Sequence, residues 1–271
     1  MPNYRKRYTN GDVYVGQLLD RKQPHGWGKM TYASRPDLDT EDPVYTSSNC
    51  TSYVGYWVNG SRCLKGKVTW ADGTVYRGEH CDNKMCGHGK LSFANGDVYK
   101  GEWRNDKCNG HGELTEATGD VYEGNFLNDL ADGHGSMTYA DKSTYVGQWR
   151  EDKFHGRGKR TFADGSVYEG DWSEDLRDGQ GTMTDANGRV YAGEWSEDTM
   201  NGHGTMTFAD GGVYVGDWAD NASTGRGTMT YSNGDVYKGW WKDNKQHGKG
   251  KYTKANGVVL RGPWYEGEQE E

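Results

Sequence analysis

The sequence predicts an all-β protein, a single-layer antiparallel β-hairpin solenoid of about ten 23-residue repeats, elongated and twisted. Three observations predict it. A Tyr-x-Gly tripeptide returns every 23 residues from Tyr53 to Tyr237. Each copy contains two segments in which apolar and polar residues alternate, and most copies close on Asp-Gly or Asn-Gly. Because so short a unit cannot bury its own apolar face, neighbouring copies must pack on one another.

The first segment of each repeat is predicted to be a strand with an aromatic face. In the copy that begins at Tyr99, Gly101 and Trp103 follow at alternate positions. Alternate residues of a strand point to the same side of a sheet, so these three positions share a face. Two copies differ, because His80 and Phe126 stand where tryptophan is expected.

A second strand is predicted after each Gly-x-Gly motif, where polar and apolar residues alternate again, as in 206–208. The Asn-Gly or Asp-Gly pair that closes a copy, such as Asn95-Gly96, favours a tight type I′ turn. The connection inside a copy, for example 104–109, has about six polar residues and is predicted to be a wider loop. Two strands per copy then give a meander that grows sideways.

One repeat domain is expected over residues 1–265, with a first repeat at 8–32, regular repeats at 53–265 and an acidic tail at 266–271. The interval from Tyr14 to Tyr53 is 39 residues, 16 more than one repeat of 23. The surplus predicts an inserted acidic loop at about residues 33–51, a stretch that contains Pro36 and Pro43. This loop is either where the chain differs from its relatives or a tolerated insertion.

Composition predicts a thin core of aromatic rings, since hydrophobic residues are 32% of a chain with 42 glycines, 19 tyrosines and 11 tryptophans. Glycine leaves room for a flat ring beside the backbone. The chain lacks an apolar run long enough to span a membrane and lacks a signal sequence, so a soluble cytoplasmic protein is expected. The five cysteines are odd in number and lack Cys-x-x-Cys spacing, which predicts free thiols in a reducing compartment.

Acidic residues gather in the predicted wide loops of a chain with a net charge of −8. Examples are Asp106, Asp129, Asp175 and Asp198. The sequence therefore predicts an acidic stripe along one edge of the sheet. Such a stripe would repel nucleic acid and anionic lipid and favour a basic partner, or it would serve only to keep the protein in solution.

No catalytic, metal or cofactor site is predicted. The histidines that recur in Gly-His-Gly are His88, His111, His134 and His203. Equivalent positions in consecutive copies are two strands apart, about 9.6 Å, which is too far for ligands of one zinc ion. The Gly-x-Gly motifs also lack the following helix that a nucleotide-binding loop needs. We therefore expect a protein that is not an enzyme and binds no cofactor or nucleic acid.

The aromatic face is the predicted functional site. A one-layer sheet must cover its apolar face by curvature, by stacking on itself or with a partner. The rings therefore form the core, or they line a groove suited to an extended peptide or an amphipathic helix. The candidate partner-binding residues are Tyr99, Trp103, Tyr122, Phe126, Tyr145, Trp149, Tyr168, Trp172, Tyr191, Trp195, Tyr214 and Trp218.

The Tyr-x-Gly-x-Trp and Gly-x-Gly pattern covers nearly the whole chain and resembles the MORN (membrane occupation and recognition nexus) repeat. The resemblance implies a twisted single-layer solenoid that binds proteins or lipids. It implies a scaffold located in a cytoskeletal or ciliary or flagellar assembly, and a homodimer. The alternative that it implies is a tether that binds phosphoinositides or membranes. The sequence disfavours the tether, because its only compact basic cluster is Arg5-Lys6-Arg7.

Overall fold

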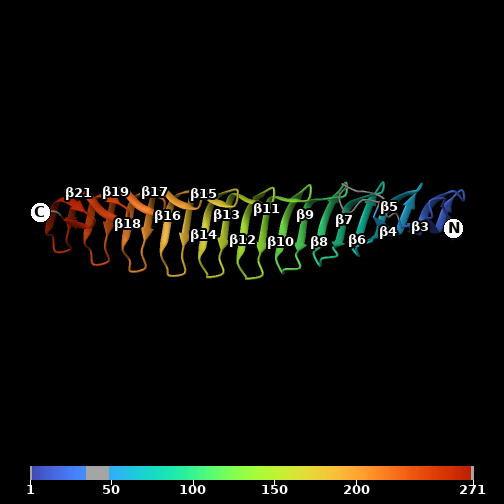
Figure 1. The fold of residues 1–271 in the computed structure, drawn as a ribbon, viewed down its shortest axis with the longest axis horizontal. Coiled ribbons are helices and arrows are strands. Elements are labelled where there is room, and N and C mark those ends of the chain that lie inside the picture. The colour runs from blue at the N-terminus through green and yellow to red at the C-terminus, as the bar shows by residue number, and fades with distance from the viewer. Residues whose placement is uncertain (1, 35–48, 270–271) are drawn as a thin grey trace. The chain divides into compact units, whose positions relative to one another are not determined.

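The computed structural model describes residues 2–34 and 49–269, and within them every regular element is a β-strand. Contacts divide the chain into two compact units, Met1–Ala140 and Asp141–Glu271. Inside each unit, hairpins follow one another in chain order (Figure 1). The predicted fold class, an all-β single layer of antiparallel hairpins, is confirmed.

The first unit contains the strands β1 Tyr4–Arg7, β2 Val13–Leu19, β3 Gln23–Thr31, β4 Cys50–Val58, β5 Ser61–Trp70, β6 Val75–Cys81, β7 Lys84–Ser92, β8 Val98–Arg104, β9 Lys107–Thr115, β10 Val121–Leu127 and β11 Leu130–Thr138. The second unit contains β12 Thr144–Arg150, β13 Lys153–Thr161, β14 Val167–Ser173, β15 Leu176–Thr184, β16 Val190–Ser196, β17 Thr199–Thr207, β18 Val213–Ala219, β19 Ala222–Thr230, β20 Val236–Lys242, β21 Lys245–Thr253, β22 Val259–Tyr265 and β23 Glu268–Gln269.

The connection inside a repeat is the tight turn, which reverses the prediction. Arg104 pairs with Lys107, and the two residues between them, Asn105 and Asp106, have φ values of 52° and 68°. Positive φ at both central residues is the mark of a type I′ turn, and asparagine and aspartate tolerate that conformation. The predicted six-residue loop is wrong because its outer residues belong to the strands.

The Asn-Gly connection between repeats is the longer one. The Phe93 N–H donates to the Asp97 carbonyl at 2.9 Å, and the Gly96 N–H donates to the Phe93 carbonyl at 3.1 Å. Among the residues of this loop, Gly96 has a positive φ, 103°, while Asn95 does not. A type I turn followed by a left-handed glycine therefore replaces the predicted type I′ turn.

The predicted acidic tail and the predicted insertion both include strand residues. Residues of the predicted acidic tail form β23, in which Gln269 lies opposite Trp264, so that part of the tail closes a further hairpin. The predicted insertion at 33–51 falls mainly on residues 35–48, which lie outside the described residues. β3 ends before it at Thr31, but β4 begins at Cys50, so the last two residues of the predicted insertion belong to a strand.

The core of each repeat is a tyrosine ring packed against two glycines. A β-carbon placed on Gly112 would lie 2.5 Å from the Tyr99 hydroxyl oxygen and 2.7 Å from its ring, so only glycine fits beneath the ring. The hydroxyl donates to the Glu102 carbonyl at 3.0 Å. Such rings are buried in every repeat from Tyr14 to Tyr237. Burial accordingly raises the pKa of Tyr191 to about 12.

A β-bulge follows the glycine of each Tyr-x-Gly tripeptide. The acid or amide that usually comes after this glycine has a structural role at the bulge. The register shifts between Gly101 and Trp103, and the Glu102 carboxylate accepts the backbone N–H of His111 at 3.1 Å. Asp171 does the same for Gln180 at 2.8 Å. A bulge leaves a ladder donor unpaired, and this side chain satisfies it.

Candidate partner-binding surface

The twelve aromatic residues predicted to line a groove are core residues. They are Tyr99, Trp103, Tyr122, Phe126, Tyr145, Trp149, Tyr168, Trp172, Tyr191, Trp195, Tyr214 and Trp218, and none exposes more than 6% of its surface. We call the face on which they lie the inner face and the opposite one the outer face. Because their rings pack on one another, a partner on the inner face cannot reach them, and the structure favours the core interpretation over the groove.

Trp172 illustrates how the rings of neighbouring repeats interlock. Its ring meets those of Tyr168 and Tyr145 edge to face, with centroids 5.0 and 5.6 Å away, and that of Phe154 at 5.3 Å. Its indole N–H donates to the Gly158 carbonyl at 3.1 Å. Edge-to-face contact is a preferred geometry of aromatic pairs. The ring is therefore shared by two repeats and stabilises the junction between them.

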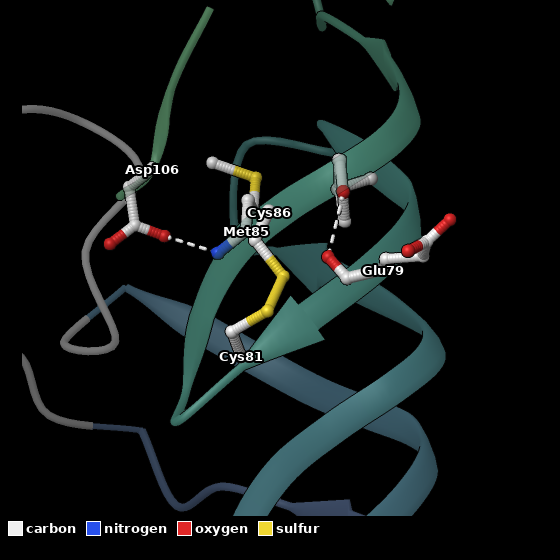
Figure 2. The surroundings of a disulfide bond; sticks show 6 residues. Glu79, Cys81, Met85, Cys86 and Asp106 are labelled. Atoms are coloured by element: carbon white, nitrogen blue, oxygen red, sulfur yellow. Dashed lines mark hydrogen bonds between the residues drawn. A yellow bond between two sulfur atoms is a disulfide. The ribbon is translucent and has the colours of Figure 1, made fainter. Parts of the chain in front are cut away.

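Much of the predicted acidic stripe has a structural role. The second residue of a tight turn accepts the backbone N–H of the residue 21 positions earlier, as Asp106 does from Met85 at 2.7 Å (Figure 2). The backbone N–H of Asp106 donates to the Met85 carbonyl at 3.1 Å. We call this pair of bonds the turn clamp. The same side-chain bond is made by Asn83, Asp129, Asp175, Asp198, Asn221 and Asn244.

Replacing Asp106 with alanine should lower the free energy of unfolding by about 2 kcal/mol, because it removes the bond to Met85 and leaves alanine at positive φ. Asn105→Ala carries only the backbone strain, about 1 kcal/mol, since Asn105 also has positive φ. Asp106→Asn should be within about 0.5 kcal/mol of the parent, because asparagine serves at Asn83. Urea unfolding measures all three, and equal losses for Asp106→Asn and Asp106→Ala would contradict the clamp.

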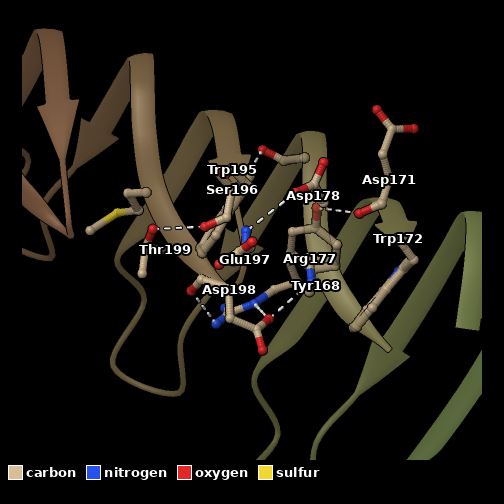
Figure 3. Close-up of polar contacts among 12 residues, drawn as sticks. Tyr168, Asp171, Trp172, Arg177, Asp178, Trp195, Ser196, Glu197, Asp198 and Thr199 are labelled. Carbon is tan, nitrogen blue, oxygen red and sulfur yellow. Dashed lines mark hydrogen bonds and ion pairs between the residues drawn. The ribbon is translucent and has the colours of Figure 1, made fainter. Parts of the chain in front are cut away.

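The inner face of the second unit is hollowed beside Trp172 by a cavity of about 550 Å³. Arg177 lines it, and its guanidinium is held by Asp198: Nε donates to Oδ1 and Nη2 to the carbonyl, both at 2.8 Å (Figure 3). The guanidinium also lies 4.3 Å from the Trp195 ring. Since Arg177 is committed to these contacts and four aspartates surround the cavity, this hollow does not form the predicted aromatic groove.

A larger groove, of about 800 Å³, lies on the outer face of the first unit and is called the outer groove here. The backbone of four glycines on strands β5 to β8 lines it, namely Gly66, Gly78, Gly89 and Gly101. At one end stands Trp27 of β3. Trp27 lies opposite Tyr56 of β4, with ring centroids 5.1 Å apart, edge to face. These two rings are 49% and 44% exposed.

The remaining side chains of the outer groove are mostly cationic. Its lining includes Lys65, Lys67, Arg77, Lys90 and Lys100, with His88 and a single carboxylate, Glu79. The prediction that Arg5-Lys6-Arg7 is the only compact basic cluster is therefore wrong. The groove cations are separated along the chain, and strand pairing brings them together.

The MORN repeat family model matches nine segments that together make up most of the chain. They are residues 53–75, 81–98, 99–121, 122–144, 145–167, 168–188, 191–213, 214–236 and 237–259. The chain belongs to the MORN repeat family. The resemblance predicted from the tyrosine, glycine and tryptophan pattern is thus confirmed. The matched segments include most residues that line the outer groove, but not Trp27 of β3 or Arg77, Gly78 and Glu79 of β6.

Solved structures resemble this MORN chain only distantly. The TCP10 domain of Danio rerio CPAP, in complex with a peptide of Danio rerio STIL, has 16% identity over 74% of this chain and 94% of that one, with a TM-score of 0.42. The CPAP G-box domain has 15% identity over 74% and 99%, with a TM-score of 0.41. Virginiamycin B lyase from Staphylococcus aureus has 13% identity over 97% and 84%, with a TM-score of 0.16. No curated protein matches the chain.

The MORN repeat at Tyr76 contains a disulfide, where free thiols were expected. Cys81 at the end of β6 is bonded to Cys86 of β7 across a tight turn, with 5.9 Å between their Cα atoms (Figure 2). The prediction of five free thiols is wrong for this pair and right for Cys50, Cys63 and Cys108. The two-residue turn at Asp82 and Asn83 brings these cysteines together, whereas a wide loop was expected there.

His80 occupies the tryptophan position of the same MORN repeat and is buried, with its ring edge to face against Tyr53 and Tyr76. Burial first, and the charge of Arg62 next, lower the pKa of His80 to about 4. Below about pH 6.5 the His80 imidazole therefore binds a proton in the unfolded chain but not in the folded chain. Stability that is present above pH 6.5 is lost as the pH falls toward 4.

We expect this loss to reach about 3 kcal/mol, and His80→Phe should abolish it, because Phe126 fills the same position in another repeat. The measurement is the urea midpoint at several pH values from about 7.5 to 4, a span set by the unfolded and folded pKa values. His203→Gln, at an exposed position, is the control. If the parent and His80→Phe lose stability in parallel on acidification, His80 is not the group responsible.

Two of the recurring histidines face acids on the outer face: His88 lies opposite Glu102, and His203 contacts Asp217 at 3.1 Å. Within residues 2–34 and 49–269, no three His, Cys, Asp or Glu side chains gather in a way that could hold a metal ion. The same residues include no helix with the length and apolar character needed to cross a membrane.

Proposed function

We propose that this MORN repeat protein is a non-catalytic scaffold that binds another protein through the outer groove of its first unit. The observation that carries the proposal is the exposed Trp27–Tyr56 pair beside the groove. Tryptophan, tyrosine and arginine dominate the binding energy of protein interfaces, and Arg77 completes the set here. Two large rings left in solvent beside a hollow are typical of a surface that a partner covers.

The absence of catalysis is part of the proposal and is supported by membership of a repeat family used for binding. Family membership is also the sole support for a place in a cytoskeletal, ciliary or flagellar assembly. The Cys81–Cys86 disulfide does not fit a reducing compartment, where such bonds are rare. Thiol labelling in native extract tests the location: a labelled Cys81 supports the cytoplasm, and a protected one supports an oxidising compartment.

The scaffold proposal is tested by affinity capture from the native cell followed by mass spectrometry. Trp27→Ala combined with Tyr56→Ala should weaken binding of the specific partner by about thirtyfold or more, since hot-spot truncation costs about 2 kcal/mol or more. Trp240→Ala is the matched control, an exposed tryptophan (45%) of the second unit. Circular dichroism should show both variants folded. Equal recovery by the parent and the double variant would rule out the outer groove.

Flotation with vesicles of phosphatidylcholine and phosphoinositide separates the scaffold from the membrane tether. The scaffold is expected to stay with the protein fraction. Robust flotation that is lost at moderate salt, together with no protein partner in the capture, would instead support the tether.

A further inference from the structure

The outer groove holds four cations in one row across adjacent strands. Lys67 of β5 lies opposite Arg77 of β6, Arg77 opposite Lys90 of β7, and Lys90 opposite Lys100 of β8. We call these four residues the cation row. Directly opposite side chains have β-carbons about 4.5 to 5.5 Å apart, and like charges at that separation destabilise a sheet. The free protein therefore holds an arrangement that opposes its own stability.

Neighbouring carboxylates compensate little of this charge. Lys100 forms an ion pair with Glu113 at 2.8 Å. Among the described residues, the other three members of the row have no carboxylate within ion-pair distance. Arg77, Lys90 and Lys100 are exposed and Lys67 is half-buried, so their charges face the groove and solvent.

The repeat itself does not require cations at this position. In the second unit the equivalent row alternates in sign where Lys159 meets Glu169, 3.9 Å apart. It is uncharged at Thr182 and Ala192, and it is cationic again at β20 to β22, where three residues lie opposite one another, namely Lys238, Lys251 and Arg261. Four successive cations are thus a property of strands β5 to β8 and not of the MORN pattern. Residues that break a stability rule without compensation are typical of functional sites.

We propose that the cation row binds an acidic segment of the partner protein, laid across strands β5 to β8 with its carboxylates facing the row and its end near Trp27. This inference rests on the proposed scaffold function and names the chemistry of the partner. Three strand intervals span about 14 Å, which matches two to three turns of an acidic helix. The site ends at β9, because Glu113 continues the row there and would repel the segment.

The width of the row favours a single chain over an anionic membrane. Two residues along the strands, about 7 Å away, the outer face is mixed in charge, with Glu79 opposite Lys65 and Glu102 opposite His88. A planar bilayer that reached the row would bring its headgroups against these carboxylates. One peptide chain contacts the row and avoids them, so charge complementarity selects the narrow ligand.

The test is fluorescence anisotropy with a labelled helical peptide of about twelve residues, rich in glutamate, and a lysine-rich peptide of the same length. The full chain should bind the acidic peptide and not the basic one, more weakly as salt rises. Lys67→Gln, Arg77→Gln and Lys90→Gln together should weaken binding at least about tenfold. Because the change removes repulsion, this triple variant should unfold at the same or a higher urea concentration than the parent.

Lys84→Gln, Arg104→Gln and Lys107→Gln together form the matched control, with the same change in net charge at exposed positions near the tight turns. This control should bind within about twofold of the parent. Equal losses in both triple variants, or no binding of the acidic peptide by the parent, would overturn the proposal. A loss caused instead by Lys238→Gln, Lys251→Gln and Arg261→Gln would move the site to the second unit and overturn it too.

Two further experiments, partner capture and vesicle flotation, test the acidic segment separately from the proposed scaffold function. If partner recovery falls in the Trp27 variant but not in the triple variant of the cation row, the scaffold proposal is supported and the acidic-segment proposal is wrong. If phosphatidylserine vesicles float the parent but not the triple variant, and the peptide does not bind, the row is a lipid site and the acidic segment is again wrong.

Discussion

Gly158→Ala is expected to lower the free energy of unfolding by about 3 kcal/mol or more. The new β-carbon would lie 2.3 Å from the Tyr145 hydroxyl oxygen and 2.6 Å from its ring. That ring cannot move aside, because it is fully buried and stacks on Phe154 with centroids 3.7 Å apart. Displacing it would also break the bond from the hydroxyl to the Gln148 carbonyl. Urea unfolding gives the magnitude.

Gly165→Ala is the matched control for this glycine. Gly165 has a φ of 85° and nothing within 4 Å of a new β-carbon, so the substitution should cost only the left-handed strain, about 1 kcal/mol. In a double-mutant cycle with Tyr145→Ala, the added alanine at position 158 should cost almost nothing once the ring is gone. Equal losses in the free energy of unfolding for the two substitutions would show that contact with the Tyr145 ring is not the reason that position 158 is glycine.

Trp172→Ala is expected to cost about 3 to 5 kcal/mol, the usual range for removing a large buried ring. It leaves a cavity between Tyr145, Phe154 and Tyr168 and removes the bond to the Gly158 carbonyl. Trp172→Phe should cost about 1 to 2 kcal/mol, because Phe126 meets Tyr122 and Tyr99 in the same geometry. Urea unfolding again gives both values.

The contrast with Trp27 separates the core from the proposed binding surface. Trp27→Ala removes a half-exposed ring and should change stability by less than about 1 kcal/mol while partner capture falls. Trp172→Ala should affect capture only where the chain has unfolded. A folded Trp172→Ala variant that lost its partner would restore the predicted aromatic groove.

The strands could be predicted because their signal is local. Tyr99, Gly101 and Trp103 alternate along one segment, and alternation alone places them on one face. The turns could not be assigned correctly, because polarity at 104–109 is shared by strand ends and loop residues, and only pairing of Arg104 with Lys107 shows which are which. The Cys81–Cys86 bond was missed for the same reason.

The twelve aromatic residues predicted as a groove are buried, and the surface that we propose for partner binding lies on the opposite face. A tyrosine and tryptophan stripe indicates either a core or a groove, and the choice depends on whether rings of adjacent repeats meet. The 5.6 Å contact between Trp172 and Tyr145 belongs to two repeats, so no single segment reveals it. Trp27 and Tyr56 lie outside the stripe and became candidates only through their exposure.

By itself, the sequence determined that this protein is a MORN repeat chain whose core is tyrosine on glycine. Spacing of 2 and 23 residues is a property of the chain and needs no partner strand to be read. The tertiary structure alone decided that Lys67, Arg77, Lys90 and Lys100 form one row. They are 10 to 13 residues apart in the chain, and a sheet places strands about 4.8 Å apart whatever the length of chain between them.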